Sequence, residues 1–266
     1  MQKYKNILMG SVVVGLLAAA AMFVIPIPES WDFSTFEFYW PLASNALMAC
    51  LHLGAVILFV LSLTVYKAKL RLAFTGIVLG IIFTALGTIQ LPIIDALDLW
   101  GSPYVTTGII GVPFLLAGFV IYLGASSFGH LVGDKSWLGR KWLIIPGGLV
   151  VGALLGTFLP HIPLPTKESD FDIAMSINFW MVALEFAATA IIFRIKQRMG
   201  AHYSKAVLYL GLALFTGTTA VLVATIDTFV SPNAHGPLMS AVNVLAIFAG
   251  WFWLTAGFAF ARTKEY

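Results

Sequence analysis

The chain has 266 residues, of which 60% are hydrophobic and only 10% are charged, and its mean hydropathy is +0.94. A soluble domain carries about 25% charged residues, so this composition excludes a soluble enzyme, a disordered chain and a nucleic-acid binder that works through a basic patch. The formal net charge is +3, and the single cysteine, Cys50, excludes an internal disulfide and a CxxC motif. The sequence predicts an all-α integral membrane protein.

Eight apolar stretches follow one another along the chain, each close to the ~20 residues that a helix needs to cross a bilayer. They are continuously apolar and do not alternate with period two, which favours helices over a barrel. Proline and glycine punctuate the connectors between them. We therefore expect eight transmembrane helices, at about residues 7–27, 41–66, 72–97, 105–129, 142–160, 174–193, 204–229 and 237–261.

Basic residues are concentrated in every second connector. With eight spans, 14 of the 15 lysines and arginines fall on one side of the membrane, and only Lys167 falls on the other. Cytoplasmic segments carry the excess of such residues, so we expect both termini in the cytoplasm of a prokaryotic cell with the chain in its cytoplasmic membrane. The first span resembles a cleavable signal peptide, but its recurrence in the second half predicts that it is retained.

Acidic residues have the opposite distribution. Nine of the twelve lie in the outer connectors or at the outer helix ends. Ordinary solvation of loops explains such a pattern, and the alternative is a negative outer face that attracts a cationic partner or metal ions. Beyond the lipid bilayer itself, the partners we expect are other membrane subunits or a cationic partner at this face, and not nucleic acid.

The two halves of the chain repeat each other at a nearly constant offset. Residues 25–28 match 162–165, residues 45–52 match 178–185, and residues 83–95 match 215–227. Each unit has four spans, an even number, so both copies enter the membrane in the same direction. We predict two parallel four-helix repeats, at residues 1–133 and 137–266.

Small residues recur every four positions in the first and fifth spans. Such rows let helix backbones approach closely, so we expect both spans to make tight helix contacts. The rows are Ser11, Gly15 and Ala19 in the first span, and Gly148, Gly152 and Gly156 in the fifth.

Two ionisable residues lie about eleven positions into their spans, at equivalent places in the two repeats. They are His52 and Glu185. Ionisable groups at membrane depth are costly and are candidates for function by default. If both spans face the axis between the repeats, the two side chains could form a hydrogen-bonded pair. Asn45 and Asn178 lie seven residues earlier and share a face with them.

Asp95 and Asp227 stand near the outer ends of the third and seventh spans. Together with the buried pair and the two asparagines, they could line a polar path from the acidic outside to mid-depth for a proton, a cation or a ligand. The alternative is an interhelical hydrogen-bond network that only fixes the register of the helices.

The sequence contains no nucleophile elbow, P-loop or HExxH motif, so it predicts no catalytic residues and no metal site. The plan of two parallel four-helix units is similar to that of haem A synthase, but the paired axial histidines are missing, so haem is not predicted and the cofactor stays unknown. Three functions remain open. They are a non-catalytic subunit, scaffold or ligand-sensing module, which the strongly apolar spans and the lack of catalytic groupings favour; a small proton- or cation-coupled transporter or channel with a His/Glu site; and a membrane enzyme acting on a lipid or quinone.

Overall fold

The computed structural model describes residues 2–27, 34–64, 66, 68–97, 111–158, 171–230 and 238–263, and these are almost entirely helical. A short 3-10 turn, η3 (Trp137–Gly139), precedes the fifth of eight α-helices. The helices are α1 (Gln2–Met22), α2 (Thr35–Leu63), α3 (Ala68–Ala96), α4 (Val112–Leu131), α5 (Lys141–Phe158), α6 (Phe171–Arg198), α7 (Ala201–Val230) and α8 (Met239–Arg262).

Seven of these helices are long and apolar enough to cross a membrane. The eighth, α5, is apolar too, but its apolar run Lys141–Leu155 is shorter. The all-α prediction is confirmed, and the seven apolar helices are those of a multi-pass membrane protein. The count of eight spans stays a prediction.

Six helices form a closed ring of neighbours. Along the chain, α2 packs on α3 and α3 on α4, and likewise α6 packs on α7 and α7 on α8. Contacts between α4 and α6 and between α8 and α2 join the two halves and close the ring. The association of the halves therefore depends mainly on these two interfaces, and a smaller contact between α1 and α8 adds to them.

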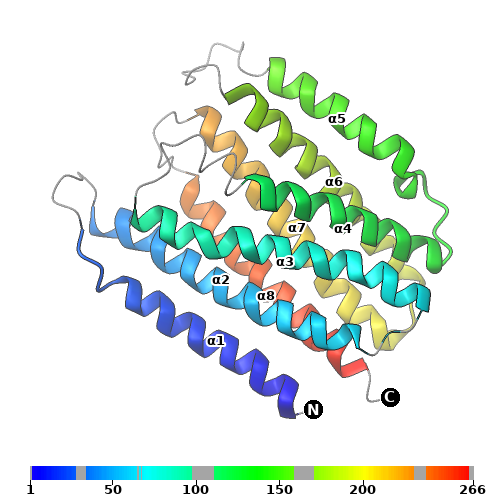
Figure 1. Ribbon diagram of the computed structural model, residues 1–266, viewed down its shortest axis with the longest axis horizontal. Helices are drawn as coiled ribbons and strands as arrows, with labels where there is room; N and C mark the ends of the chain where they lie inside the picture. The colour runs from blue at the N-terminus through cyan, green and yellow to red at the C-terminus, as the bar shows by residue number, and fades with distance from the viewer. Residues whose placement is uncertain are drawn as a thin grey trace.

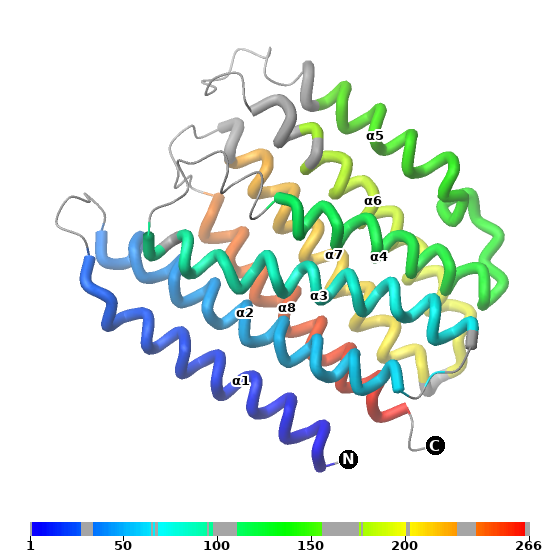
Figure 2. The backbone as a smooth tube through the Cα atoms, viewed as in Figure 1, coloured from blue at the N-terminus to red at the C-terminus, as the bar shows by residue number. Residues whose placement is uncertain are grey.

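The remaining two helices lie outside the ring, at opposite edges of the bundle (Figure 1). Helix α1 packs mainly on α2, and α5 packs mainly on α6. Their outward faces expose large apolar side chains such as Leu17 and Trp142, as expected of helices in contact with lipid. The traced chain also shows both termini at the same end of the bundle (Figure 2).

Local sequence explains where α2 begins. Ser34 accepts a hydrogen bond from the backbone N–H of Glu37, and the Glu37 carboxylate accepts one from the backbone N–H of Ser34. This capping box satisfies two of the backbone groups that a helix start leaves open. Prolines stand inside three helices, at Pro41, Pro92 and Pro146, and neighbouring helices allow this in membrane proteins.

The half of the ring nearer the termini is filled with apolar side chains. One continuous cluster contains Phe59 of α2, Phe74 of α3, Tyr122 of α4, Ile192 of α6 and Phe260 of α8, each at most 2% exposed. The rings of Phe74 and Phe260 meet edge to face with centroids 4.8 Å apart, a favoured aromatic geometry. This apolar core lies between the mid-depth polar residues and the end of the bundle that carries the termini.

Candidate functional site

His52 lies in the middle of α2 and is 2% exposed. Its Nδ1 lies 2.9 Å from the carbonyl oxygen of Met48, one turn earlier on the same helix. A carbonyl oxygen can only accept, so Nδ1 carries the hydrogen in this bond. The other ring nitrogen of a neutral imidazole is then a hydrogen-bond acceptor.

Glu185 holds the equivalent place in α6 and is 8% exposed. Its Oε2 lies 2.9 Å from the hydroxyl oxygen of Thr218 in α7. The same hydroxyl lies 2.7 Å from the backbone carbonyl oxygen of Leu214. A hydroxyl has one proton to donate, so it makes a full two-centre bond to only one of these oxygens and otherwise shares its proton between them. A neutral carboxyl group would satisfy both contacts, because it could donate to Thr218 while Thr218 donates to Leu214.

The possible hydrogen-bonded pair of His52 and Glu185 does not form. The hydrogen bonds of the two side chains go to Met48 and Thr218, and neither side chain bonds the other. The physical reason is the order of the ring, in which α2 has α3 and α8 as neighbours whereas α6 has α4 and α7. Each ionisable group consequently sits in its own environment.

Each of these two environments is completed by a glycine from the other half of the chain. A Cβ atom at Gly250 of α8 would lie 3.3 Å from Cε1 and Nδ1 of His52, and one at Gly118 of α4 would lie 3.4 Å from Cγ of Glu185. At Gly250 the imidazole would have to shift by a few tenths of an ångström to admit a Cβ atom. At Gly118 the tight contact of a Cβ atom would be with Cγ of Met181, at 2.8 Å, whereas the contact with Glu185 is an ordinary one. Sequence reasoning missed both glycines, although an Ala-Gly pair recurs after seven residues in α8, at 249–250 and 256–257.

The four other residues of the expected polar path have different surroundings. Asn45 is buried in α2, and Asn178 is half-buried in α6. Asp227 is 3% exposed, and its Oδ1 accepts a hydrogen bond of 3.3 Å from the backbone N–H of Leu238, the residue before α8. Asp227 thus joins the end of α7 to the start of α8. Asp95 belongs to α3, but its side chain lies outside the described residues.

The small-residue rows lie against the next helix in the chain. A Cβ at Gly15 would lie 3.2 Å from Cβ of Cys50 in α2, and one at Gly152 would lie 2.7 Å from the backbone oxygen of Ser176 in α6. Ser11 occupies the space beside Gly54 of α2, and Gly148 faces Trp180 of α6. Ala19 is half-buried, and the surroundings of Gly156 lie outside the described residues.

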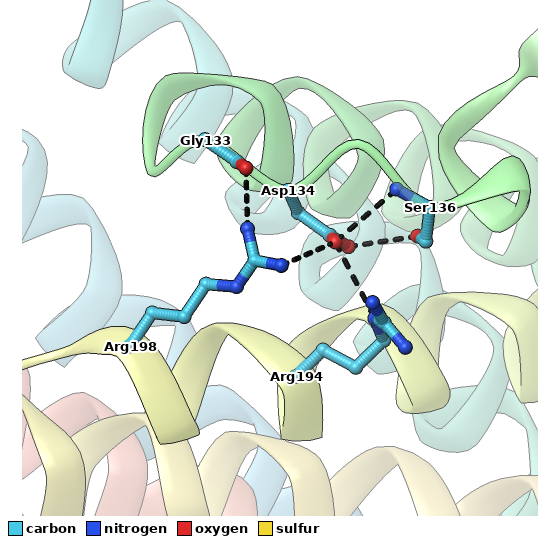
Figure 3. Close-up of polar contacts among 5 residues, drawn as sticks. All are labelled: Gly133, Asp134, Ser136, Arg194 and Arg198. Carbon is cyan, nitrogen blue, oxygen red and sulfur yellow. Dashed lines mark hydrogen bonds and ion pairs between the residues drawn. The ribbon is translucent and has the colours of Figure 1, made fainter.

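A charged cluster joins the connector between α4 and α5 to the end of α6 (Figure 3). The side chain of Asp134 is 2% exposed and lies 3.3 Å from Nε of Arg194 and 3.4 Å from a guanidinium nitrogen of Arg198. Arg198 also donates to the carbonyl oxygen of Gly133, and the Ser136 hydroxyl donates to Asp134 at 2.8 Å. Burial alone would raise the pKa of Asp134, but the hydrogen bonds from Ser136 and the charge and hydrogen bond of Arg194 together hold it below its ordinary value.

Three further polar side chains in the outer half of the bundle were not singled out from the sequence. Trp40 Nε1 and Gln90 Oε1 are buried and have no hydrogen-bond partner within the described residues. Asn243 of α8 is 5% exposed and lies seven residues before Gly250. That spacing puts it on the face of α8 that packs against α2.

Comparison of the chain with protein-family models, with curated proteins and with solved structures finds no match. The site consists of two separate buried groups, His52 and Glu185, each with its own hydrogen-bond partner.

Proposed function

We propose that this chain is a non-catalytic, multi-pass membrane protein that acts as a subunit, a scaffold or a ligand-sensing module. The observation that carries the proposal is that each described buried ionisable group has a local partner of its own. His52 bonds a carbonyl of its own helix, Glu185 bonds Thr218, Asp134 pairs with two arginines, and Asp227 bonds the start of α8. Groups arranged in this way stabilise a fold, whereas catalytic groups converge on a common point.

The filled interior of the ring is a second support. The apolar cluster around Phe59, Phe74 and Phe260 lies between the mid-depth polar groups and the end with the termini. A proton or a hydrated cation that followed the ring axis would have to cross this apolar layer, where an unsolvated charge is very costly. The packing therefore favours a scaffold or sensor over a channel through the ring.

One observation favours a transporter as a second candidate. The contacts of Thr218 with both Glu185 and Leu214 are satisfied together when Glu185 carries a proton. A buried carboxyl group that is neutral in one state and charged in another is a proton-binding site of the kind used in proton relays. Such a protein would have to open the apolar layer during its cycle.

Proteoliposome flux measurements distinguish the two candidates. Purified protein is reconstituted into vesicles that contain a pH-sensitive dye, and a potassium diffusion potential drives proton entry. We expect wild type and Glu185→Gln to match empty vesicles. Proton flux in the wild type that Glu185→Gln abolishes would overturn the assignment as a subunit, scaffold or ligand-sensing module. It would establish the transporter.

The proposal includes two parallel four-helix repeats, residues 1–133 and 137–266. The neighbour order supports it, because α1 to α4 and α5 to α8 have the same sequence of contacts. The glycine contacts support it as well. Gly118 packs on Glu185 as Gly250 packs on His52, and both pairs have equivalent positions in the two repeats.

The orientation is also part of the proposal. With eight spans, both termini lie in the cytoplasm, and the end of the bundle that carries them is the end richest in lysine and arginine. This rule describes bacterial inner membranes among others, and we place the chain in a prokaryotic cytoplasmic membrane. The acidic outer connectors, available to a cationic partner, fall mostly outside the described residues.

A further inference from the structure

A cavity of about 330 Å³ opens at the end of the bundle that carries the termini. Its walls come from α3, α4, α7 and α8 and from the segments that precede α3 and follow α6. The lining helices are members of the ring from both halves, and Phe74, Phe128 and Phe260 belong to the apolar core, so the cavity lies between the halves at the edge of this core. Its volume is within the range of about 300–1,000 Å³ that is usual for small-molecule sites.

The bottom of this cavity is aromatic. Phe74, Phe128 and Phe260 line it, and each is at most 2% exposed. Tyr66 stands beside Phe74, with ring centroids 4.9 Å apart at an interplanar angle of 63°. Aromatic walls arranged edge to face provide favourable contacts for another flat ring.

The cavity wall is uncharged. None of the residues that line it is acidic or basic. Burial is the largest cause that raises the pKa of Tyr66 to about 12. The nearby Tyr203 also raises this pKa, and the Thr263 hydroxyl lowers it. Tyr66 is therefore neutral at physiological pH, and a charged ligand body would lose its hydration without a counter-charge.

Two tyrosine hydroxyls belong to the wall. That of Tyr66 is buried and has no hydrogen-bond partner within the described residues, and the half-buried Tyr203 is the more accessible to a ligand. Tyr203 of α7 lines the cavity, is half-buried, and its hydroxyl has no hydrogen-bond partner within the described part of the chain. A phenolic hydroxyl both donates and accepts. A ligand with an acceptor oxygen at one end could bond it while its rings lie on the phenylalanines below.

We propose that this cavity binds a compact, uncharged aromatic molecule that carries a hydrogen-bond acceptor, with Tyr203 as the donor. The inference rests on the proposed non-catalytic role, of which it specifies the ligand-sensing form. The ligand enters from the compartment of the termini, since the cavity opens at that end. It binds away from His52 and Glu185, which lie on the far side of the apolar core.

A matched pair of probes tests the proposal. 2-Acetylnaphthalene and 2-ethylnaphthalene have the same carbon skeleton, but only the first has a carbonyl acceptor. Binding is measured by equilibrium dialysis against the full-length protein in nanodiscs, with empty nanodiscs subtracted. A net hydrogen bond contributes about 0.5–1.5 kcal/mol, so we expect the acetyl probe to bind about two- to tenfold more tightly.

Two variants with matched controls locate the binding. Tyr203→Phe should abolish the preference for the acetyl probe and leave the ethyl probe unchanged, whereas Tyr209→Phe, a half-buried tyrosine of the same helix outside the cavity, should change neither. Leu131→Trp at the cavity wall should weaken both probes at least tenfold. Leu143→Trp, on an equally exposed leucine of α5 (42% against 43%), should not.

The outcomes are decisive in both directions. No saturable binding of either probe, equal affinity for the two probes, or binding that Leu131→Trp leaves intact would overturn the proposed site. These binding results do not change the expected result of the flux measurement, which is no proton flux. Failure of the ligand site is therefore distinguishable from failure of the proposed function.

Discussion

Replacing Thr218 with valine removes a hydroxyl at nearly constant shape, together with its contacts to Glu185 and to the carbonyl of Leu214. A double-mutant cycle with Glu185→Leu isolates the contact to Glu185. The two oxygen atoms are 2.9 Å apart, and both residues are buried. Interhelical hydrogen bonds inside membrane proteins contribute on average about 0.6 kcal/mol and at most about 1.7 kcal/mol. In a double-mutant cycle, we expect the effects of Thr218→Val and Glu185→Leu on the free energy of unfolding to depart from additivity by an amount in that range.

Two further cycles with Glu185→Leu serve as controls. The Thr189 hydroxyl donates to the backbone carbonyl of Glu185 and not to its carboxyl group, so Thr189→Val should be additive with Glu185→Leu to within about 0.5 kcal/mol. His52→Leu should be additive as well, because His52 and Glu185 are bonded to different partners.

The assay is a titration of unfolding in mixed detergent micelles for the wild type, the single variants and the doubles. A coupling between His52 and Glu185 above about 0.5 kcal/mol, together with additivity of Thr218 and Glu185, would refute the reasoning. It would mean that the two ionisable groups pair across the ring and that Thr218 does not satisfy the carboxyl group.

Three other predictions concern packing, charge and topology. Gly124→Ala should cost about 1–3 kcal/mol of stability, because its Cβ atom would lie 2.7 Å from the backbone nitrogen of Ile77. Gly147→Ala should cost nothing measurable, because no atom lies within 4 Å of that Cβ position. Thermal unfolding in detergent compares the two variants. Asp134→Asn should cost about 1.5–3 kcal/mol at neutral pH. Since the folded pKa of Asp134 lies below its unfolded value of about 3.9, that difference should shrink as pH falls through the folded pKa, and a pH-independent difference would contradict the ion-pair account. A reporter fused after Tyr266 should be active in the cytoplasm, and activity confined to the outer side would contradict the orientation.

Much of the fold could be predicted from hydropathy alone. Inside a bilayer the backbone must satisfy its own hydrogen bonds, so each long apolar run predicts a helix. The ends of the helices were less predictable, because a helix continues beyond the apolar segment. Helix α2 was expected from residue 41 but begins at Thr35, where the capping box of Ser34 and Glu37 fixes its start.

The depth of the candidate site was predictable, but its neighbours were not. Counting residues along a helix gives the depth and face of His52 and Glu185. It does not say which helix packs against that face, and the contacts of α2 with α8 and of α6 with α4 decided the outcome. The glycines at 118 and 250 were visible in the sequence, but a small residue in an apolar helix indicates close packing without naming the partner.

The charged cluster was hidden for a different reason. Arg194 and Arg198 belong to the basic residues that indicated topology, and nothing in their spacing pointed to Asp134, which lies about sixty residues earlier. An ion pair between a connector and a distant helix end follows from tertiary packing and cannot be derived from local sequence.

The contact of α8 with α2 closes the ring and gives His52 its own environment. A Cβ at Gly250 would lie 3.1 Å from Cβ of Leu51, close to the ~3.8 Å of a disulfide. The measurement is cross-linking of Leu51→Cys with Gly250→Cys in a Cys50→Ala background, after cleavage at a protease site inserted between α5 and α6. We predict that the two fragments stay linked on oxidation and separate on reduction. A matched pair that replaces Leu51→Cys by Leu53→Cys, on an exposed face of α2, should not link. Fragments that separate without reduction in the first pair, or that link equally in both, would contradict the ring.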